Sequence, residues 1–358
     1  MHQAIPQSPV ENPGVSPYLD ALADLQTSDI SLVNGFSNHA PMVVEALFNL
    51  GAREEIAGWM ARTASTRRRR EPDTGEAVAA PQIGEWAHYD AFRRQAVAEL
   101  SRQPWRSVLR AWSARLAPGY AGAALHGVIR VGHAARGLQR LDHPHTRAEL
   151  ASALAYWAVA YGELPLQPAA PDTTPTRSVH DAWKALKPVP EDKRRNDGSI
   201  VTAVQQVRYA EGLSDILSQI AWPDDPVEST RVVARVFLDM FLVSARTRLT
   251  ALVLTHALTG LAASWTIGRA TDPSLHHALV REAFKAGAAL HLAYSPFDDK
   301  AGLPDMGGRI DREALIAGAF RTDDDHAIKL TDACLTLEAI CEDDGFRAAA
   351  RLGQNLMS

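Results

Sequence analysis

The stretch from Leu249 to Gly268, LTALVLTHALTGLAASWTIG, decides how the rest of the chain can fold. It contains no Asp, Glu, Lys or Arg and is flanked by Arg248 and Arg269. A segment of this length could cross a bilayer. However, it also holds His256, four threonines, two glycines and a serine, and no other segment of the sequence resembles a membrane span. We therefore predict the buried central helix of a globular protein, with no membrane association.

The composition is that of an ordinary globular protein. Of 358 residues, 46% are hydrophobic and 22% are charged. The net charge of −5 offers no general attraction for nucleic acid. The local exception is the basic run Arg67–Arg70, in a polar stretch that continues to Gly84. A solvated loop and an anion or nucleic-acid patch are the two interpretations of this run, and we predict the loop, hence no nucleic-acid partner.

Apolar residues recur at intervals of three and four over most of the sequence, and alternating β-branched runs are lacking. We predict an all-α fold with one large multi-helix domain at 18–358, after a flexible segment at 1–17. A long Pro-rich loop is expected at 164–199. The expected helices are 18–26, 39–50, 53–63, 87–102, 105–116, 121–138, 146–161, 200–219, 228–268, 274–292, 311–321, 323–341 and 343–353.

Several helix ends can be predicted from single residues. Asn38 is expected to cap the helix that Gly51 terminates. Thr322 is expected to cap the helix 323–341, whose first turn carries three aspartates that the helix dipole favours. The segment 228–268 is too long for one ordinary helix, so it should break or bend.

Cysteine usage and the N-terminus bear on the compartment. Cys334 and Cys341 are seven residues apart on one predicted helix, which separates them by about 10 Å and excludes a disulfide between them. The segment 1–17 is polar and Pro-rich and lacks the apolar core of a signal peptide. We predict a cytoplasmic protein.

Histidines on apolar helical faces suggest a metal site. Each of them alone is more often a hydrogen-bonded core side chain than a ligand. Several from separate helices are harder to explain in that way, because neutral imidazole is a common metal ligand and a helical bundle can bring such side chains together. His291 stays open as an alternative ligand. The five candidates, from four predicted helices, are His39, His126, His133, His256 and His326.

Lys329 lies three residues after His326, beside the apolar stripe of its helix. One interpretation is a salt bridge to Asp325 at the favourable i,i+4 spacing. The other is a buried lysine whose pKa is lowered by burial and by a nearby cation. A neutral lysine can react with carbon dioxide to form a carbamate, which is an anionic oxygen ligand.

Four segments together resemble the questin oxidase family. They are FSNHAPM at 36–42, HGVIR at 126–130, THA at 255–257 and DHAIK at 325–329, and the resemblance covers about residues 18–345. No single segment is very specific, but their order and spacing fit. The resemblance implies an all-helical enzyme that opens the quinone ring of anthraquinones, formally by Baeyer–Villiger-type oxidation or C–C cleavage.

The resemblance also implies a site. Fe(II) would be held by four histidines and a carboxylated lysine, with dioxygen as co-substrate and one octahedral position left open. Arg130 would pair with a phenolate or a developing oxyanion, or else pack against an acidic partner. His133 would be a ligand, a donor to a ligand or a substrate contact. The metal ligands implied are His39, His126, His256, His326 and Lys329, the last as the carbamate formed with carbon dioxide.

Our first hypothesis is therefore an iron-dependent oxygenase that acts on an anthraquinone-like aromatic polyketide. Two alternatives remain. One is a metal-independent Baeyer–Villiger oxidase of the same family that uses NADPH, with the histidines as acids and bases. The other is a non-enzymatic helical protein that binds a ligand. The oligomeric state stays open, with a homodimer as one possibility.

Overall fold

The apolar stretch forms a central helix, α12 (Arg248–Ala270), in a computed structural model of the chain. Thr247 and Thr250 form a reciprocal cap, in which each side chain accepts a hydrogen bond from the backbone of the other. This cap separates α12 from α11 (Pro226–Ser244), so the predicted break within 228–268 is confirmed. The structure describes residues 15–75, 78, 80–170, 174–195, 199–295 and 310–358.

Helix α12 is long and apolar enough to cross a membrane by length and composition alone. Of its most apolar window, 89% is buried inside the protein. Helices from both halves of the chain, among them α6, α11, α13 and α15, pack around it. This burial is what the core helix of a soluble protein requires.

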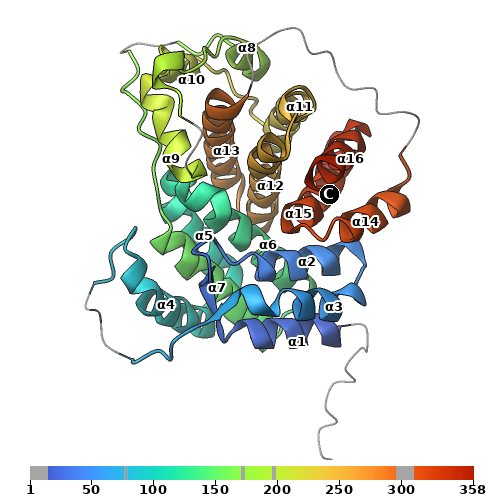
Figure 1. Ribbon diagram of the computed structural model, residues 1–358. Helices are drawn as coiled ribbons and strands as arrows, with labels where there is room; N and C mark the ends of the chain where they lie inside the picture. The colour runs from blue at the N-terminus through green and yellow to red at the C-terminus, as the bar shows by residue number, and fades with distance from the viewer. Residues whose placement is uncertain (1–14, 76–77, 79, 171–173, 196–198, 296–309) are drawn as a thin grey trace, which may run out of the picture.

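The described residues form sixteen α-helices and one two-stranded sheet, so the predicted all-α fold is confirmed (Figure 1). Buried apolar side chains make one continuous core that extends from α1 to α16. The remaining helices are α1 (Ser16–Leu25), α2 (Ala40–Leu50), α3 (Glu55–Arg62), α4 (Tyr89–Arg102), α5 (Trp105–Leu116), α6 (His126–Arg140), α7 (Pro144–Val159), α8 (Val179–Lys184), α9 (Ile200–Val204), α10 (Leu213–Ser218), α13 (Pro273–Tyr294), α14 (Arg312–Arg321), α15 (Asp325–Cys341) and α16 (Gly345–Met357).

The antiparallel strands β1 (Ser28–Leu32) and β2 (Arg67–Arg69) were not predicted. The basic run therefore lies in a strand rather than in a loop. Three of its four arginines lie within 4.0 Å of an aspartate, in the pairs Arg67–Asp24, Arg68–Asp29 and Arg70–Asp90.

Two helix predictions need correction. The helix expected at 121–138 begins only at His126, because Ala123, Ala124 and Leu125 have φ values of 45°, 55° and 68°. The helix expected at 200–219 is divided into α9, a 3-10 turn and α10, with Gly212 in the left-handed region at φ 68°.

The expected flexible segment 1–17 lies mostly outside the described residues, which begin at residue 15, and α1 already starts at Ser16. The described parts of the Pro-rich segment 164–199 contain only the six-residue helix α8 and a 3-10 turn, as a long loop requires.

Four helices from distant parts of the sequence make a closed ring. Helix α2 packs on α6, α6 on α12, α12 on α15, and α15 back on α2. Figure 1 shows α2 in blue beneath the red helix α15, with α12 beside α15. Every sequence-predicted metal ligand lies on this ring or at the start of one of its helices.

A glycine permits the closest approach within the ring. A Cβ atom built on Gly132 of α6 would lie 2.5 Å from the Cβ and 2.6 Å from the Cα of Ala263 on α12. Real Cβ contacts are never so short, so any side chain at this position must push the two helices apart. This contact sets the distance between the helices that carry His126 and His256.

We predict that Gly132→Ala lowers the free energy of unfolding by about 1–3 kcal/mol, because the overpacked helices must separate. Chemical denaturation measures the change. The control is Gly58→Ala on the exposed face of α3, where the added Cβ meets only the end of the Arg62 side chain. There the change should be neutral or stabilising by about 0.5–1 kcal/mol. Equal effects of the two substitutions would contradict the tight contact.

Candidate metal site

The loop before α2 fixes the position of His39. The backbone N–H of Asn38 donates to the Ile30 carbonyl at 2.9 Å, and its side-chain amide donates to the Asp29 carbonyl at 2.9 Å. The Asn38 side-chain oxygen accepts the Ala40 N–H at 3.0 Å, so Asn38 makes the predicted capping contact although the residue directly before α2 is His39. Gly51 ends α2 with φ 83°. His39 is thus held between β1 and the first turn of α2.

A left-handed backbone turn positions His126. Three consecutive residues, Ala123 to Leu125, have positive φ, which costs L-residues conformational energy. The turn brings the Ala123 carbonyl to 2.5 Å from Nδ1 of His126, the first residue of α6. Since a carbonyl can only accept, the His126 proton resides on Nδ1 and Nε2 carries a lone pair. Unusual backbone of this kind is typical of functional sites.

Asp324 holds His326 and caps α15. Its carboxylate accepts the backbone N–H of His326 at 2.8 Å and lies 3.5 Å from Nδ1 of the same residue. It also accepts from Arg248 of α12 at 2.8 Å. The prediction that Thr322 caps this helix was wrong, because the helix starts at Asp325, and the Thr322 hydroxyl donates to Ala319 of the preceding helix.

The four imidazoles meet in the middle of the helix ring. Neighbouring ring centroids lie 4.7 Å apart for His39–His126, 4.8 Å for His126–His256, 5.3 Å for His256–His326 and 4.7 Å for His326–His39. Nε2 of His126 is 2.8 Å from Nε2 of His39 and 3.4 Å from Nε2 of His256. The order of the rings is the order of the helices α2, α6, α12 and α15. Three of the imidazoles, those of His39, His126 and His326, form a group that could hold a metal ion, with ligand atoms within 4.8 Å of one another. His256 adjoins this group through its contacts with His126 and His326.

Each imidazole directs Nδ1 outward to an oxygen. His126 and His256 donate to backbone carbonyls, the latter at 3.0 Å from Leu252 and 3.1 Å from Val253. His39 and His326 face carboxylates, with Asp325 at 3.3 Å from His39. Oxygen partners of this kind orient metal-bound histidines and fix the tautomer in which Nε2 is the ligand atom.

The facing nitrogens of His126 and His256 present two lone pairs to each other. Protonation would remove the repulsion, but burial and the charge of Lys329 lower the pKa of His126 well below its usual range. Burial and His126 do the same to the pKa of His256. Neutral rings with both Nδ1 atoms already donating have no proton left for Nε2. A cation between them resolves this conflict, so the donor set fits a metal ion.

Lys329 is buried in the same cluster and is 2% exposed. Within the described part of the chain its Nζ makes no hydrogen bond or ion pair, so the predicted alternative of a salt bridge to Asp325 is not formed. Asp325 faces His39 instead. Burial lowers the pKa of Lys329 to about 8, although Asp325 and Asp324 counteract this. The neutral amine is therefore a minor but accessible form near neutral pH, far more populated than for an ordinary lysine.

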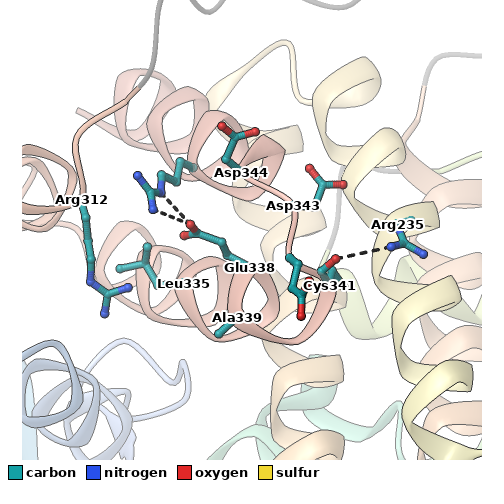
Figure 2. Close-up of a pocket in the computed structure, with 10 residues that line it drawn as sticks. Arg235, Arg312, Leu335, Glu338, Ala339, Cys341, Asp343 and Asp344 are labelled. Atoms are coloured by element: carbon teal, nitrogen blue, oxygen red, sulfur yellow. Dashed lines mark hydrogen bonds and ion pairs between the residues drawn. The ribbon is translucent and has the colours of Figure 1, made fainter.

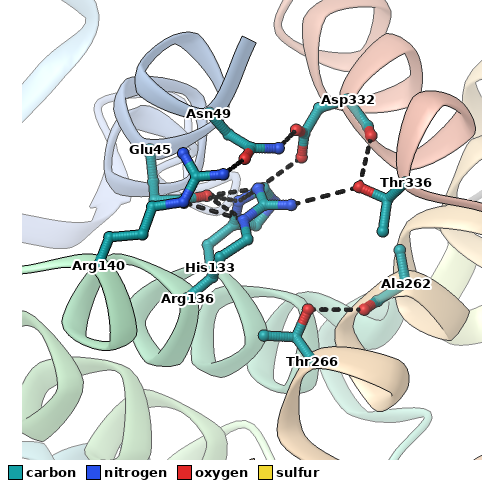
Figure 3. Close-up of polar contacts among 9 residues, drawn as sticks. All are labelled: Glu45, Asn49, His133, Arg136, Arg140, Ala262, Thr266, Asp332 and Thr336. Carbon is teal, nitrogen blue, oxygen red and sulfur yellow. Dashed lines mark hydrogen bonds and ion pairs between the residues drawn. The ribbon is translucent and has the colours of Figure 1, made fainter. Parts of the chain in front are cut away.

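His133, one of the candidate catalytic residues, lies outside the histidine cluster. Its Nδ1 is 2.7 Å from Glu45, which Arg136 also contacts at 2.5 Å. Arg136 further donates to Asp332 at 2.6 Å. We call Glu45, His133, Arg136 and Asp332 the polar layer; Figure 3 shows these side chains pointing toward one another between α2, α6 and α15.

A cavity of about 10 Å³ adjoins the polar layer and is lined by His133, Thr259 and Asp332, among others. It has room for about one water molecule and none for an organic substrate. His133 therefore contacts the polar layer and a cavity too small for an organic substrate, so a direct substrate contact is not supported.

Arg130, the other candidate catalytic residue, forms a buried two-pronged ion pair. Its Nε and Nη2 donate to the Glu149 carboxylate at 2.7 and 3.0 Å, and its guanidinium lies over the Tyr156 ring at 5.8 Å. These contacts join α6 to α7 and do not bring Arg130 to the histidine cluster. His291, the alternative ligand, packs on Trp183 at 4.8 Å, also away from the cluster.

A larger hollow of about 580 Å³ lies at the C-terminal end of α15, the end opposite His326 (Figure 2). Its lining is charged, and Arg347 already pairs with Glu338 there at 2.5 Å while Arg235 donates to the Cys341 carbonyl. The hollow contains no member of the histidine cluster, so size alone does not identify the site.

Sequence reasoning missed the residues around the ligands. Asp324 and Asp325 were assigned to a helix cap, although carboxylates next to a candidate ligand histidine are also typical partners of its Nδ1. Glu45 and Asp332 carried a weaker signal: each is an acidic residue on the buried side of a helix that also carries a ligand candidate.

Comparison with known proteins does not identify a relative: no family model matches the chain, and no curated protein matches it significantly.

The buried amine predicts a pH dependence of stability. Below pH 8 Lys329 carries its charge in both folded and unfolded protein, so burial costs the most there. Between pH 8 and the ordinary value of 10.5 the unfolded chain holds the extra proton, so the free energy of unfolding rises with pH. Denaturation curves in the presence of a chelator measure this. Between pH 8 and 10.5 the free energy of unfolding of the wild type should increase relative to that of Lys329→Met. A difference that does not change with pH would contradict the buried charge.

Proposed function

We propose that the protein is an iron-dependent oxygenase with four histidines and a carboxylated lysine as metal ligands. The observation that carries the metal is the convergence of Nε2 atoms whose Nδ1 atoms are all turned to oxygens. The five ligands are His39, His126, His256, His326 and Lys329. Bound Fe(II) would supply the one-electron chemistry that allows dioxygen to react with an electron-rich aromatic compound.

The surroundings of Lys329 favour an anion at this position. Helices α2, α6 and α15 all begin at the cluster, and helix N-termini carry partial positive charge. A bare divalent cation would oppose these charges, while a metal with an anionic ligand would not. The neutral amine of Lys329 can add to carbon dioxide with loss of one proton, which gives a carbamate oxygen at the cluster.

With a carbamate as the fifth ligand, the metal site carries a small net charge. Four neutral imidazoles add nothing, and one carbamate reduces the charge of Fe(II) to about +1 in this simple count. Asp325 and Asp324 then hold His39 and His326 without joining the ligand set.

An aromatic substrate is supported by the surface near His39. Phe36 and Trp86 are 67% and 49% exposed, which is unusual for large aromatic side chains. The Trp86 ring lies 6.0 Å from Tyr156, whose hydroxyl is 2.6 Å from that of Ser37, two residues before His39. Exposed rings beside the loop can stack on a flat aromatic compound. Together with the resemblance to questin oxidases, this favours an anthraquinone-like polyketide in a cytoplasmic enzyme.

We expect Lys329→Ala to lose iron and oxygen uptake with a hydroxyanthraquinone, because the anionic ligand is removed. Iron is measured after anaerobic purification, and carbon-13-labelled bicarbonate should give a carbamate signal in wild type alone. Bicarbonate with a short-chain carboxylic acid should partly restore the variant. Lys187→Ala, at a lysine that is 64% exposed, is the control and should change nothing.

The same preparations separate the alternatives. Full activity of Lys329→Ala would exclude the lysine as a ligand. Unchanged activity after exhaustive chelation, with NADPH required, would favour the metal-independent oxidase. If His39→Ala, His256→Ala and His326→Ala lower stability but wild type binds no metal, the histidines are core residues of a non-enzymatic protein.

A further inference from the structure

The polar layer connects the helices that carry the candidate ligands. Arg136 of α6 donates through Nε to Glu45 of α2 at 2.9 Å and through Nη2 to both Glu45 and Asp332, at 2.5 and 2.6 Å. Asp332 belongs to α15. One guanidinium therefore joins three helices, and its two carboxylate partners lie 91 and 196 positions from Arg136 in the sequence.

On each of the three helices, the residue of the polar layer follows the candidate ligand by a short stretch of sequence. Glu45 follows His39 by six residues, Arg136 follows His126 by ten, and Asp332 follows Lys329 by three. At a rise of about 1.5 Å per residue these offsets are about 5–15 Å along the helix axes. Arg136 thus holds each helix about one to three turns beyond the ligand that the helix supplies.

The layer is buried and almost fully paired. The side chains of Glu45, Asp332 and Arg136 are 2%, 3% and 13% exposed. Burial disfavours the Glu45 carboxylate, but Arg136 and the hydrogen bond from His133 more than offset this and lower its pKa below the usual range. Asn49 of α2 and Thr336 of α15 add further contacts to Asp332 and Arg136 (Figure 3). Buried networks of this kind hold one arrangement, because a displaced charge would lose its partners.

We propose that Arg136, through Glu45 and Asp332, is a positioning residue that holds α2, α6 and α15 in the register that the metal cluster needs. The inference rests on the proposed metal site. The proposal accounts for an arginine at this position, because its planar guanidinium can donate to two carboxylates on different helices in a fixed geometry. A lysine ammonium is a point charge and cannot do so.

The test compares Arg136→Lys with Arg347→Lys in the full chain, with Co(II) alone as the probe. Arg347 of α16 also donates through Nε and Nη2 to a carboxylate of α15, Glu338, but α16 carries no candidate ligand. We expect Arg136→Lys to weaken Co(II) affinity by about 10–100-fold and to alter the Co(II) visible spectrum. Arg347→Lys should keep the wild-type affinity and spectrum, whatever its effect on stability.

The outcomes are distinct. Wild-type affinity and spectrum in Arg136→Lys would overturn the positioning role and leave the proposed metal site standing. Failure of wild type to bind Co(II) or Fe(II) would overturn both. If Arg136→Lys does not fold, Glu45→Gln replaces it, since the carboxamide keeps one acceptor oxygen for Arg136 but loses the second and the negative charge. That variant should also lose Co(II) affinity, and unchanged affinity would again overturn the role.

Discussion

The site depends on one electrostatic constraint: imidazole nitrogens with bare lone pairs face one another inside the protein. His126 and His256 have given their Nδ1 protons to backbone carbonyls, and burial prevents them from gaining a second proton. Two such lone pairs at 3.4 Å repel unless a positive charge lies between them. The constraint makes the cluster chemically different from a group of ordinary core histidines, whose nitrogens each find a donor or an acceptor.

The rest of the fold brings these nitrogens together. Helix α12 supplies a buried axis, and Gly132 lets α6 approach it closely. The histidines connect all four helices of the ring, α2, α6, α12 and α15. About one to three turns farther along, the polar layer connects α2, α6 and α15. The left-handed backbone turn at 123–125 orients the His126 ring, and the carboxylate of Asp324 orients the His326 ring. Stability and site geometry therefore depend on the same contacts.

Much of the fold could be predicted because helical periodicity is a local signal. The central helix, the break before it and the Asn38 cap followed from neighbouring residues. The strand pair was missed because β1 and β2 are short and lie about 35 residues apart in the sequence. His39, His126, His256, His326 and Lys329 could be singled out as polar residues on apolar faces, and the structure brings them together. The partners of these residues could not be predicted, since the sequence does not show which carboxylate meets which ring. For Arg130 two roles were left open, and the structure shows the ion pair with an acidic partner, Glu149.

The central claim is that four neutral imidazoles hold one metal ion through Nε2. X-ray absorption at the iron edge of the anaerobically reconstituted protein measures this directly, because imidazole rings give a characteristic multiple-scattering signal. We expect the scattering of four histidines together with an oxygen ligand. A spectrum with no imidazole scattering, or with oxygen neighbours only, would contradict it.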